Sequence, residues 1–599
     1  MPSEFLTLND LILPPPLPAM VSILLLAGSF EFSDLALRRV RLDPSPVERA
    51  GAFVLLMAIC GGLVHAMALA HLATLPVLRF VAGVIVAGGA VAFATRWQAG
   101  MARVAETRRY WAQAGVAERV ALAVVASTVT ALFLTACGPV TDIDSLDYHL
   151  GVPLDWLRHG GVTPQPHWLT ARLTGLGEAI NMLGLAAGTD GLGAMIQVSG
   201  LVALLLALGS LAKNSRDRAL ALLLVITPAV LPLATAQKPQ LFPIAAVAVG
   251  MILALTAKSR LDFVLAFACA AFAMSCKYSF YAPGAMVFVV ALVRASKQHR
   301  LRFAAGCAIA AAALFAGPVL GRNVQFYGDP FSPFLEGLKQ HPDASVSRFA
   351  AELASAGEPH TLRGLLTLLL RLFIPSGPGS ISTLGAGMFA LCFASQSPWS
   401  RSLLICSAIV TVLVLWRGQL APRFLLEPYF FCAMVAVAAP WSKPKAFLFH
   451  SLIVQSCVVA IAALVGTGLI FPGALTRGLR QRVMQEAALG YAQALWMDKV
   501  IPRGETVMVE SRAYAFFPRP FVIPWCQACD SATFLEMAVQ QEGKSGVSRV
   551  VVAEFPFEGA VPANCSTRTL AGPQTFPFAT RNPFNWREYQ AIALRVECR

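Results

Sequence analysis

The sequence is short of charged residues. Only 13% of its 599 residues are Asp, Glu, Lys or Arg, and 56% are hydrophobic, whereas soluble globular proteins carry roughly 25% charged residues. This deficit excludes a string of soluble domains, because such a chain could not cover a surface that faces water. Its apolar runs of about 18 to 25 residues match the length that a helix needs to cross ~30 Å of hydrocarbon. We therefore expect a polytopic α-helical membrane protein with about 11–14 transmembrane helices.

Several other features are missing. No basic stretch precedes the first apolar run, and the N-terminus carries Pro14-Pro15-Pro16, so we expect no cleavable signal peptide. We find no internal repeat, which weakens a transporter interpretation, because many carriers are built from duplicated halves. Acidic residues are outnumbered and the net charge is +14, but the basic residues gather in short connectors such as Arg38 to Arg41 and Arg294 to Arg302. This is typical of cytoplasmic loops, so we do not expect nucleic acid as a partner.

Apolar runs and basic connectors together predict a topology. The expected spans are 17–35, 50–70, 76–95, 118–138, 191–212, 218–236, 241–257, 261–276, 278–294, 303–321, 379–395, 402–417, 424–440 and 446–471. Alternation places the basic connectors on one side, which the positive-inside rule makes cytoplasmic. The loops 139–190 and 322–378, the links near Lys238, Lys277 and Arg423, and the tail then face outward.

The tail has a different pattern from the rest of the chain. We expect an amphipathic helix over 475–499, strands over 505–510 and 547–552, and a helix over 531–541, which together indicate a small extracytoplasmic α/β domain. The predicted division is therefore 1–117 for extra N-terminal helices, 118–471 for the main membrane region and 472–599 for the C-terminal domain.

The tail also contains four cysteines, Cys526, Cys529, Cys565 and Cys598. An even number of cysteines in an outward-facing domain favours disulfides. A zinc site is the alternative, because Cys526 and Cys529 have ligand spacing, but the second pair is too widely spaced for a standard zinc ribbon.

An acidic cluster follows the span that ends near residue 138. Asp142, Asp144 and Asp147 lie within six residues and are followed by Tyr148 and His149. Most acidic clusters are solvated loops, and that interpretation stays open here. Carboxylates are nevertheless scarce at the other predicted outer ends of the spans, which makes this concentration a candidate site.

These residues carry a family resemblance. The segment Asp144-Ser145-Leu146-x-Tyr148-His149-Leu150, followed by Pro153, Trp156 and Leu157, resembles the first extracytoplasmic loop of GT-C-type integral membrane glycosyltransferases. Three later segments are similar to motifs of the same superfamily: Gly321-Arg322-Asn323 with Tyr327-Gly328-Asp329-Pro330, Lys277-Tyr278, and Pro422-Arg423-Phe424-Leu425-Leu426-Glu427-Pro428-Tyr429. The resemblance covers about residues 118–440. The sequence departs from the simplest family pattern in having three spans before the acidic loop, and in Asp329 where Asn is expected.

The resemblance implies a fold and a reaction. The fold is GT-C-like, and the reaction is transfer of a sugar from a polyprenyl-phosphate donor to a glycan, lipid or protein acceptor on the outer face of the membrane. Because the donor already carries a good leaving group, the enzyme needs no general acid. One carboxylate suffices to take the acceptor proton, and attack from the opposite face inverts the anomeric carbon. Asp144 is the first candidate for this base and Asp142 the second.

Basic residues must neutralise the departing phosphate. Lys238, Lys277, Arg322 and Arg423 are the candidates, because the predicted topology places all four at outer span ends. The alternative is that they snorkel to the interface.

Other polar residues complete the predicted site. We expect Tyr148, His149 and Glu178 to help bind substrate, although packing explains each of them equally well. A divalent cation between Asp142 and Asp144 is a minority possibility, and we assign no metal ligands.

The sequence thus predicts a membrane glycosyltransferase of the bacterial inner membrane, with membrane lipids around it and its C-terminal domain outside the cytoplasm. The main alternative is a polytopic transporter or a flippase for lipid-linked glycans. A third possibility is a non-catalytic assembly protein with a sensory domain.

Overall fold

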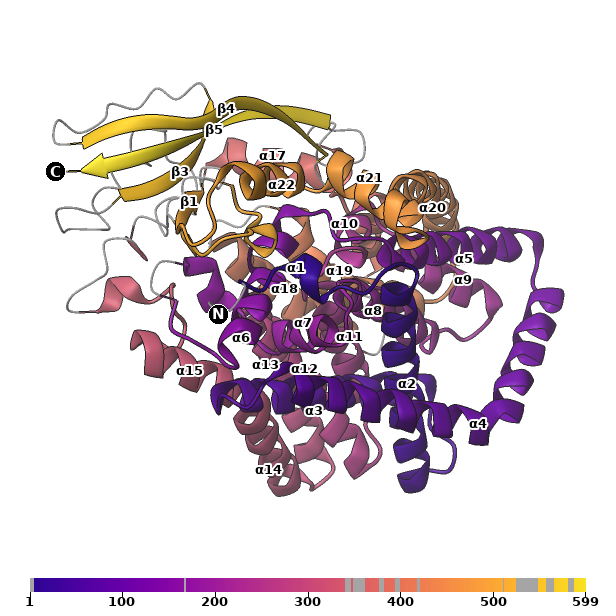
Figure 1. Cartoon of the computed structure of the whole chain (residues 1–599). Coiled ribbons are helices and arrows are strands. Elements are labelled where there is room, and N and C mark those ends of the chain that lie inside the picture. Colours follow the sequence, from indigo (N-terminus) through magenta and orange to yellow (C-terminus); the bar gives the residue numbers. More distant parts are fainter. Residues whose placement is uncertain are drawn as a thin grey trace.

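The computed structural model describes residues 5–165, 168–339, 346–347, 361–375, 382–393, 399–416, 421–509, 511–523, 548–555, 565–579 and 586–598. Within these ranges the chain forms a large helical body with a small sheet domain at its C-terminal end (Figure 1). Eight described helices are long and apolar enough to cross a membrane, or nine if one bent pair counts as a single span. This confirms the polytopic helical fold and the small C-terminal domain.

The N-terminal part contains four long helices after a short α1 (Leu8–Leu11). They are α2 (Leu17–Val40), α3 (Pro46–Leu69), α4 (Leu75–Gln113) and α5 (Val116–Cys137). Ser45 caps α3 by accepting the Glu48 N–H, and Pro46 occupies the first helical position, where its missing N–H costs nothing. Helices α2 and α4 pack closely enough that the Cα of Gly28 would lie 2.0 Å from a Cβ placed on Gly89.

The middle of the chain alternates short elements with spans. Its helices are α6 (Gly151–His159), α7 (Leu176–Ala186), α8 (Leu192–Gly209), α9 (Ser215–Val225), α10 (Leu231–Ala234), α11 (Leu241–Thr256), α12 (Arg260–Cys276), α13 (Tyr281–Lys297), α14 (Leu301–Ala311) and α15 (Gly317–Tyr327). Two π-helical turns lie among them, η1 (Ser145–His149) and η5 (Ala312–Ala316), together with the short 3₁₀ helices η2 (Leu169–Leu173), η3 (Pro228–Val230), η4 (Tyr278–Phe280) and η6 (Glu336–Leu338).

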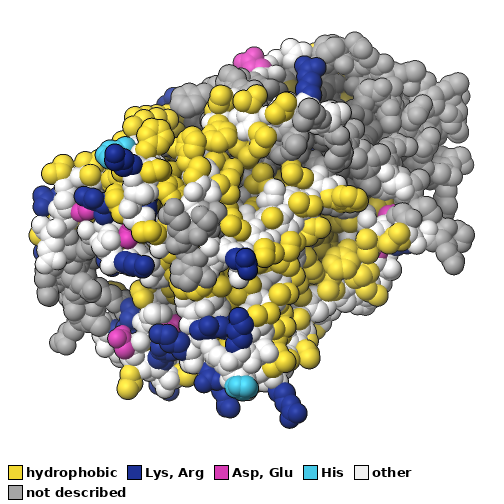
Figure 2. All heavy atoms as spheres, turned by 180° about the vertical axis from the view of Figure 1, so that it is seen from behind, with side chains coloured by type: hydrophobic (Ala, Val, Ile, Leu, Met, Phe, Trp, Pro, Cys, Tyr) yellow, Lys and Arg dark blue, Asp and Glu magenta, His cyan; other side chains and the backbone are white. Residues whose placement is uncertain are grey.

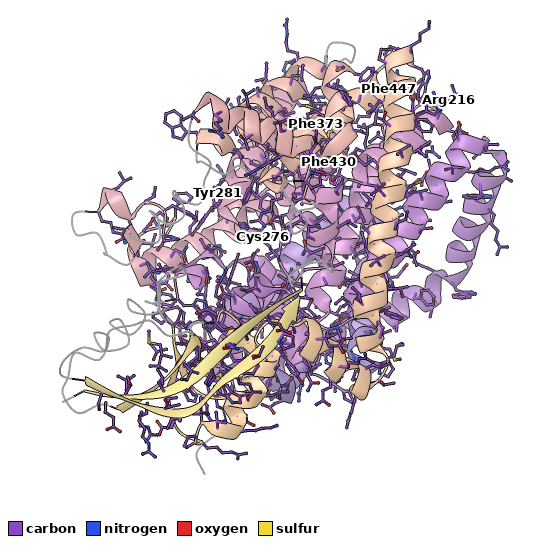
Figure 3. All side chains as sticks on the ribbon, turned by 90° about the horizontal axis from the view of Figure 1, so that it is seen from above. Arg216, Cys276, Tyr281, Phe373, Phe430 and Phe447 are labelled. Atoms are coloured by element: carbon purple, nitrogen blue, oxygen red, sulfur yellow. The ribbon has the colours of Figure 1, made fainter. Side chains whose placement is uncertain are left out.

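The last part of the membrane body is less regular. It contains α17 (Leu362–Phe373), η7 (Gly385–Phe393), α18 (Ser400–Trp416), η8 (Pro422–Leu425), α19 (Leu426–Ala438), α20 (Lys443–Ile470) and η9 (Phe471–Ala474). Helix α17 lies within the expected outer loop 322–378, where no helix was predicted. Phe373 at its end contacts Phe389 of η7, which contacts Phe447 of α20. Figure 3 places Phe373 and Phe447 toward the end of the molecule opposite the C-terminal sheet.

Several expected spans are shorter or broken helices. The span expected over 218–236 bends by 53° between Val225 and Pro228, because a proline supplies no N–H and disfavours helix in the residue before it. The span expected over 379–395 is the 3₁₀ helix η7 in the described residues. Helices α11 and α19 are buried almost all round. A helix surrounded by protein on every side can be apolar without spanning the full hydrocarbon width.

The C-terminal part begins with two helices, α21 (Arg477–Ala487) and α22 (Tyr491–Val500), instead of the single helix expected. Gly490 separates them with a φ of +73°, a conformation that favours glycine. The sheet that follows has the order β2-β1-β3-β5-β4. Its strands are β1 (Val507–Val509), β2 (Phe521–Val522), β3 (Ser548–Phe555), β4 (Cys565–Ala579) and β5 (Trp586–Cys598).

The sheet is mixed. Strand β1 runs parallel to β2 and β3, and the strand pairs β3–β5 and β4–β5 are antiparallel. Strands β1 and β3 confirm the two predicted strands, whereas β2, β4 and β5 were not predicted. The register places Cys565 opposite Cys598, and the disulfides stay a prediction. Cys526, Cys529 and the predicted helix 531–541 lie outside the described residues.

The connectors group at two ends of the molecule. Lys445 pairs with Asp217 at 2.8 Å, and Arg300 donates to the Lys258 carbonyl at 2.8 Å. Both contacts join connectors that were predicted to lie on the same, basic side. In Figure 2, Lys and Arg side chains gather toward the lower and left edges, beside a broad apolar surface. The acidic loop lies at the other end and contacts the C-terminal domain through η1 and η10 (Tyr514–Phe516).

Candidate active site

The acidic loop folds into a tight turn at the end of α5. The Asp142 Oδ1 atom accepts the Ser145 N–H at 3.1 Å, and η1 then carries Ser145 to His149. The Ser145 hydroxyl oxygen accepts the Gln237 N–H at 2.9 Å. Asn181 donates to the carbonyls of both His149 and Gln237, each at 2.9 Å. These bonds fasten the loop to α7 and to the segment after α10, which places residue 144 next to residue 238.

Asp144 and Lys238 form the centre of the candidate site. The Lys238 Nζ atom donates to Asp144 Oδ2 at 2.9 Å. The Lys238 side chain is 2% exposed, whereas that of Asp144 is 16% exposed. A buried ammonium needs a partner of opposite charge. The carboxylate therefore neutralises Lys238 while one face of it stays open to solvent.

Two further predicted cations lie around this pair. Lys277, between α12 and η4, interacts electrostatically with Lys238, Arg423, Asp144 and Glu178. Its Nζ atom lies 5.9 Å from the ring centre of Phe424, and the guanidinium of the neighbouring Arg423 lies 5.1 Å from the same ring. Segments far apart in the chain thus bring these residues to one place.

Arg322 is held differently. Its side chain is buried, and it donates to the Thr174 hydroxyl at 3.1 Å, to the Thr174 carbonyl at 2.8 Å and to the Arg172 carbonyl at 3.3 Å. It also bonds the amide oxygen of Asn323. Through these bonds Arg322 holds the loop before α7 in place. Its positive charge also interacts electrostatically with Glu178.

Glu178 and His149 form a second polar pair beside the centre. The two side chains are 1% and 2% exposed, and Oε1 lies 2.6 Å from Nδ1. The other carboxylate oxygen accepts the Gly175 N–H at 2.6 Å, as in a capping box. Burial raises the pKa of Glu178 to about 7, against the opposing effect of the Gly175 hydrogen bond. The rings of Tyr148 and His149 contact each other in a tilted arrangement, with centres 3.9 Å apart.

Two glycines let α7 approach this closely. A Cβ on Gly175 would lie 1.9 Å from the Ser275 carbonyl oxygen, and one on Gly177 would lie 2.3 Å from the Cβ of Pro239. Any side chain at these positions would push α7 away from the segments that carry Lys238 and Lys277. The glycines around Glu178 therefore set the depth at which its carboxylate lies. Figure 3 labels Cys276, the residue before Lys277, in the interior between the C-terminal sheet and the far end of the helical body.

The C-terminal domain contributes a residue that the sequence analysis missed. The Arg512 side chain donates through Nε and Nη2 to Asp147 Oδ2 at 2.8 and 2.6 Å, and its Nη2 lies 3.5 Å from Asp144 Oδ1. Burial opposes the charge of Arg512, but Asp147 and Asp144 together raise its pKa. Asp147 is thus a support residue. One signal for Arg512 was available, because polar residues after a strand in an α/β domain lie at the edge where such sheets bind ligands.

The predicted residues therefore divide into groups. Asp144, Lys238, Lys277 and Arg423 converge, Glu178, His149 and Tyr148 lie beside them, and Arg322 braces the loop. Asp142 shapes the turn through its bond to Ser145. Within the described ranges, no group of three His, Cys, Asp or Glu side chains is arranged to hold a metal ion, and the divalent cation stays a prediction.

The comparisons with known proteins give two findings. A family model, the DUF1420 N-terminal domain, matches residues 115–484, and no curated protein matches the chain. Among solved structures, the crystal structure of ArnT from Cupriavidus metallidurans bound to undecaprenyl phosphate is similar, with 11% identity and a TM-score of 0.47, over 79% of this chain and 97% of that chain. The family model matches more than half of the residues of this chain, and the chain therefore belongs to the DUF1420 family.

Proposed function

We propose that this protein transfers a sugar from a polyprenyl-phosphate donor to an acceptor at the outer face of the membrane, with inversion. The observation that carries the proposal is the cluster of one partly open carboxylate, Asp144, with Lys238, Lys277 and Arg423. A carboxylate can take a proton, and several cations at one place suit a phosphate. The motif resemblance to GT-C glycosyltransferases supports the same reaction.

Asp144 is the proposed general base. Its oxygens face Lys238 at 2.9 Å and Arg512 at 3.5 Å, and two neighbouring cations make a carboxylate a weak proton acceptor. A donor phosphate entering the cluster would compete for these cations. Asp144 would then be left with less compensation, and it would accept a proton more readily as the donor binds.

In the proposed step, Asp144 takes the proton of an acceptor hydroxyl, and the acceptor oxygen forms a bond to the anomeric carbon. The bond from that carbon to the phosphate oxygen breaks, and the polyprenyl phosphate leaves with the electron pair. Lys238, Lys277 and Arg423 would stabilise the charge that grows on the phosphate, because positioned cations act most strongly where water is excluded. Asp142 is the second candidate for the base.

The other predicted residues would shape the site. Three residues lie beside the cluster and would contact the sugar or the acceptor: Glu178, His149 and Tyr148. Arg322 would keep the loop before α7 in place. The proposal keeps the predicted division, in which 118–471 would be the catalytic region, 1–117 added helices and 472–599 a domain on the outer side of the bacterial inner membrane. The acceptor would be a glycan, a lipid or a protein.

The test uses the full chain in lipid nanodiscs. Two quantities are measured: binding of undecaprenyl phosphate, and transfer of labelled sugar from extracted polyprenyl-phosphate sugars to a cell-envelope extract. Asp144→Asn should abolish transfer and keep lipid binding, because the amide cannot accept the proton. Asp217→Asn is the matched control, since Asp217 forms a 2.8 Å ion pair with Lys445 at the other end of the molecule. It should keep both properties.

The outcomes separate the alternatives. Transfer by Asp144→Asn at the wild-type rate would overturn Asp144 as the base and leave Asp142 as the candidate. A wild-type protein that transfers no sugar would overturn the proposed function and favour a non-catalytic assembly protein. A wild-type protein that moves labelled lipid-linked sugar across the bilayer without transferring it would favour the flippase.

A further inference from the structure

The C-terminal domain reaches the acidic loop through one edge of its sheet. Arg512 lies three residues after the end of β1, at the carboxyl ends of the parallel strands β1, β2 and β3. The next element, η10, contacts both η1 and α6. The end of the sheet at which the parallel strands terminate thus faces the site, and Arg512 extends into the site.

Aromatic packing holds this edge in place. The Trp168 ring packs edge-to-face on Tyr514 at 5.2 Å and on Phe521 at 6.1 Å. Phe521 in turn packs on Phe5 of the N-terminal segment at 6.3 Å. Trp168 and Tyr514 are 3% and 4% exposed. The contact therefore joins three separate parts of the chain beside the acidic loop.

Asp147 links this packing to the site. Its Oδ1 atom accepts the Trp168 indole N–H at 3.0 Å, while its Oδ2 atom takes the two N–H groups of Arg512. The Asp147 side chain is 1% exposed. A carboxylate buried this deeply needs its cation, because removing one partner of a buried ion pair leaves an uncompensated charge. The conformation of η1 therefore depends on Arg512.

Arg512 also faces Asp144, three residues before Asp147. A guanidinium presents several donors in a fixed plane, so one side chain can hold two carboxylates at set positions. Its Nη2 atom lies 2.6 Å from Asp147 and 3.5 Å from Asp144. Lys238 holds the other oxygen of Asp144. When a phosphate draws Lys238 away, Arg512 would still orient the carboxylate.

We propose that Arg512 is a positioning residue for Asp144, supplied by the C-terminal domain, so that the site is complete only when this domain is docked. The inference rests on the proposed function for the role of Asp144. Arg512 acts through the two carboxylates and does not bind the donor phosphate itself.

The test compares three variants of the full chain in nanodiscs. Arg512→Gln should lower kcat by about tenfold or more, with KM and undecaprenyl phosphate binding changed by less than about threefold, because only orientation is lost. Arg512→Lys should recover part of kcat, since it keeps the charge but not the planar fork. The matched control is Arg595→Gln, which breaks an ion pair with Glu505 within the same domain and has a similar exposure, 27% against 25%. It should leave kcat unchanged.

A second readout does not depend on turnover. Hydrogen exchange of residues 142–150 should become faster in Arg512→Gln and stay unchanged in Arg595→Gln. Wild-type kcat in Arg512→Gln, or loss of lipid binding together with kcat, would overturn the positioning role. Failure of the proposed function would look different, because the wild-type protein would then transfer no sugar while the exchange result for Arg512→Gln remained.

Discussion

Replacing Lys238 by Met tests the phosphate site most directly. The substitution removes the ammonium that lies 2.9 Å from Asp144 and keeps an apolar stem of similar length. A hydrogen bond to a charged group contributes ~1.5–3 kcal/mol, and each 1.4 kcal/mol changes an affinity about tenfold. We therefore expect the Kd of undecaprenyl phosphate to rise roughly 10- to 150-fold. The upper end applies best, because Asp144 would then repel the phosphate.

Lys445→Met provides the matched control. Lys445 forms a 2.8 Å ion pair with Asp217, and its side chain is 0% exposed, against 2% for Lys238. Breaking such a buried pair costs about 3–5 kcal/mol. Asp144 is 16% exposed and keeps Arg512 nearby, so the stability loss in Lys238→Met should be smaller, about 1–3 kcal/mol.

The two variants should therefore rank in opposite order in two assays, one of stability and one of lipid binding. Thermal unfolding in detergent should show Lys445→Met as the less stable protein, and native mass spectrometry in nanodiscs should show Lys238→Met as the weaker lipid binder. The double variant with Asp144→Asn should recover part of the lost binding by removing the repulsion. Wild-type affinity in folded Lys238→Met would refute the phosphate role of this lysine, and equal losses of binding in both variants would point to general destabilisation.

Three further predictions concern the supports of the site. Burial raises the pKa of Glu178 from 4.5 to about 7. Its contribution of about 3 kcal/mol to the free energy of unfolding is therefore complete below pH 4.5 and lost as the pH rises through about 7. Glu178→Gln should flatten this part of the plot of thermal stability against pH, and an unchanged plot would contradict the assignment. Gly175→Ala should destabilise the protein by about 1–3 kcal/mol or more, since its Cβ would lie 1.9 Å from the Ser275 carbonyl oxygen, and a wild-type Tm would show that α7 can shift. Arg480→Gln should speed tryptic release of the C-terminal domain, because Arg480 pairs at 2.7 Å with Asp190, whose side chain is 1% exposed; unchanged cleavage would mean that other contacts hold the domain.

The local chain pattern predicted much of the fold because hydrophobic length is a local property. The long spans α2, α3, α5 and α20 follow from uninterrupted apolar runs between basic connectors. The strands β1 and β3 follow from short segments rich in valine. The break at Pro228 and the 3₁₀ helix η7 were missed, because an apolar run is equally compatible with a straight span and with a bent segment packed inside the protein.

The candidate site shows the same division. Its residue types were readable from the sequence: three carboxylates at the end of a span, and Lys238, Lys277 and Arg423 at predicted outer ends, where basic residues are uncommon. Which of them meet was a matter of tertiary structure, because the Asp144–Lys238 pair joins residues 94 positions apart.

Arg512 lies 368 positions from Asp144, and neither the composition nor the periodicity of the sequence relates the two. The packing of Tyr514 and Phe521 on Trp168 helps to bring this arginine to the acidic loop. The sequence by itself thus determined a helical membrane protein, and it predicted carboxylates and several basic side chains at one end of it. The tertiary structure decided which oxygen faces which cation, because side-chain contacts between distant segments depend on how whole elements pack.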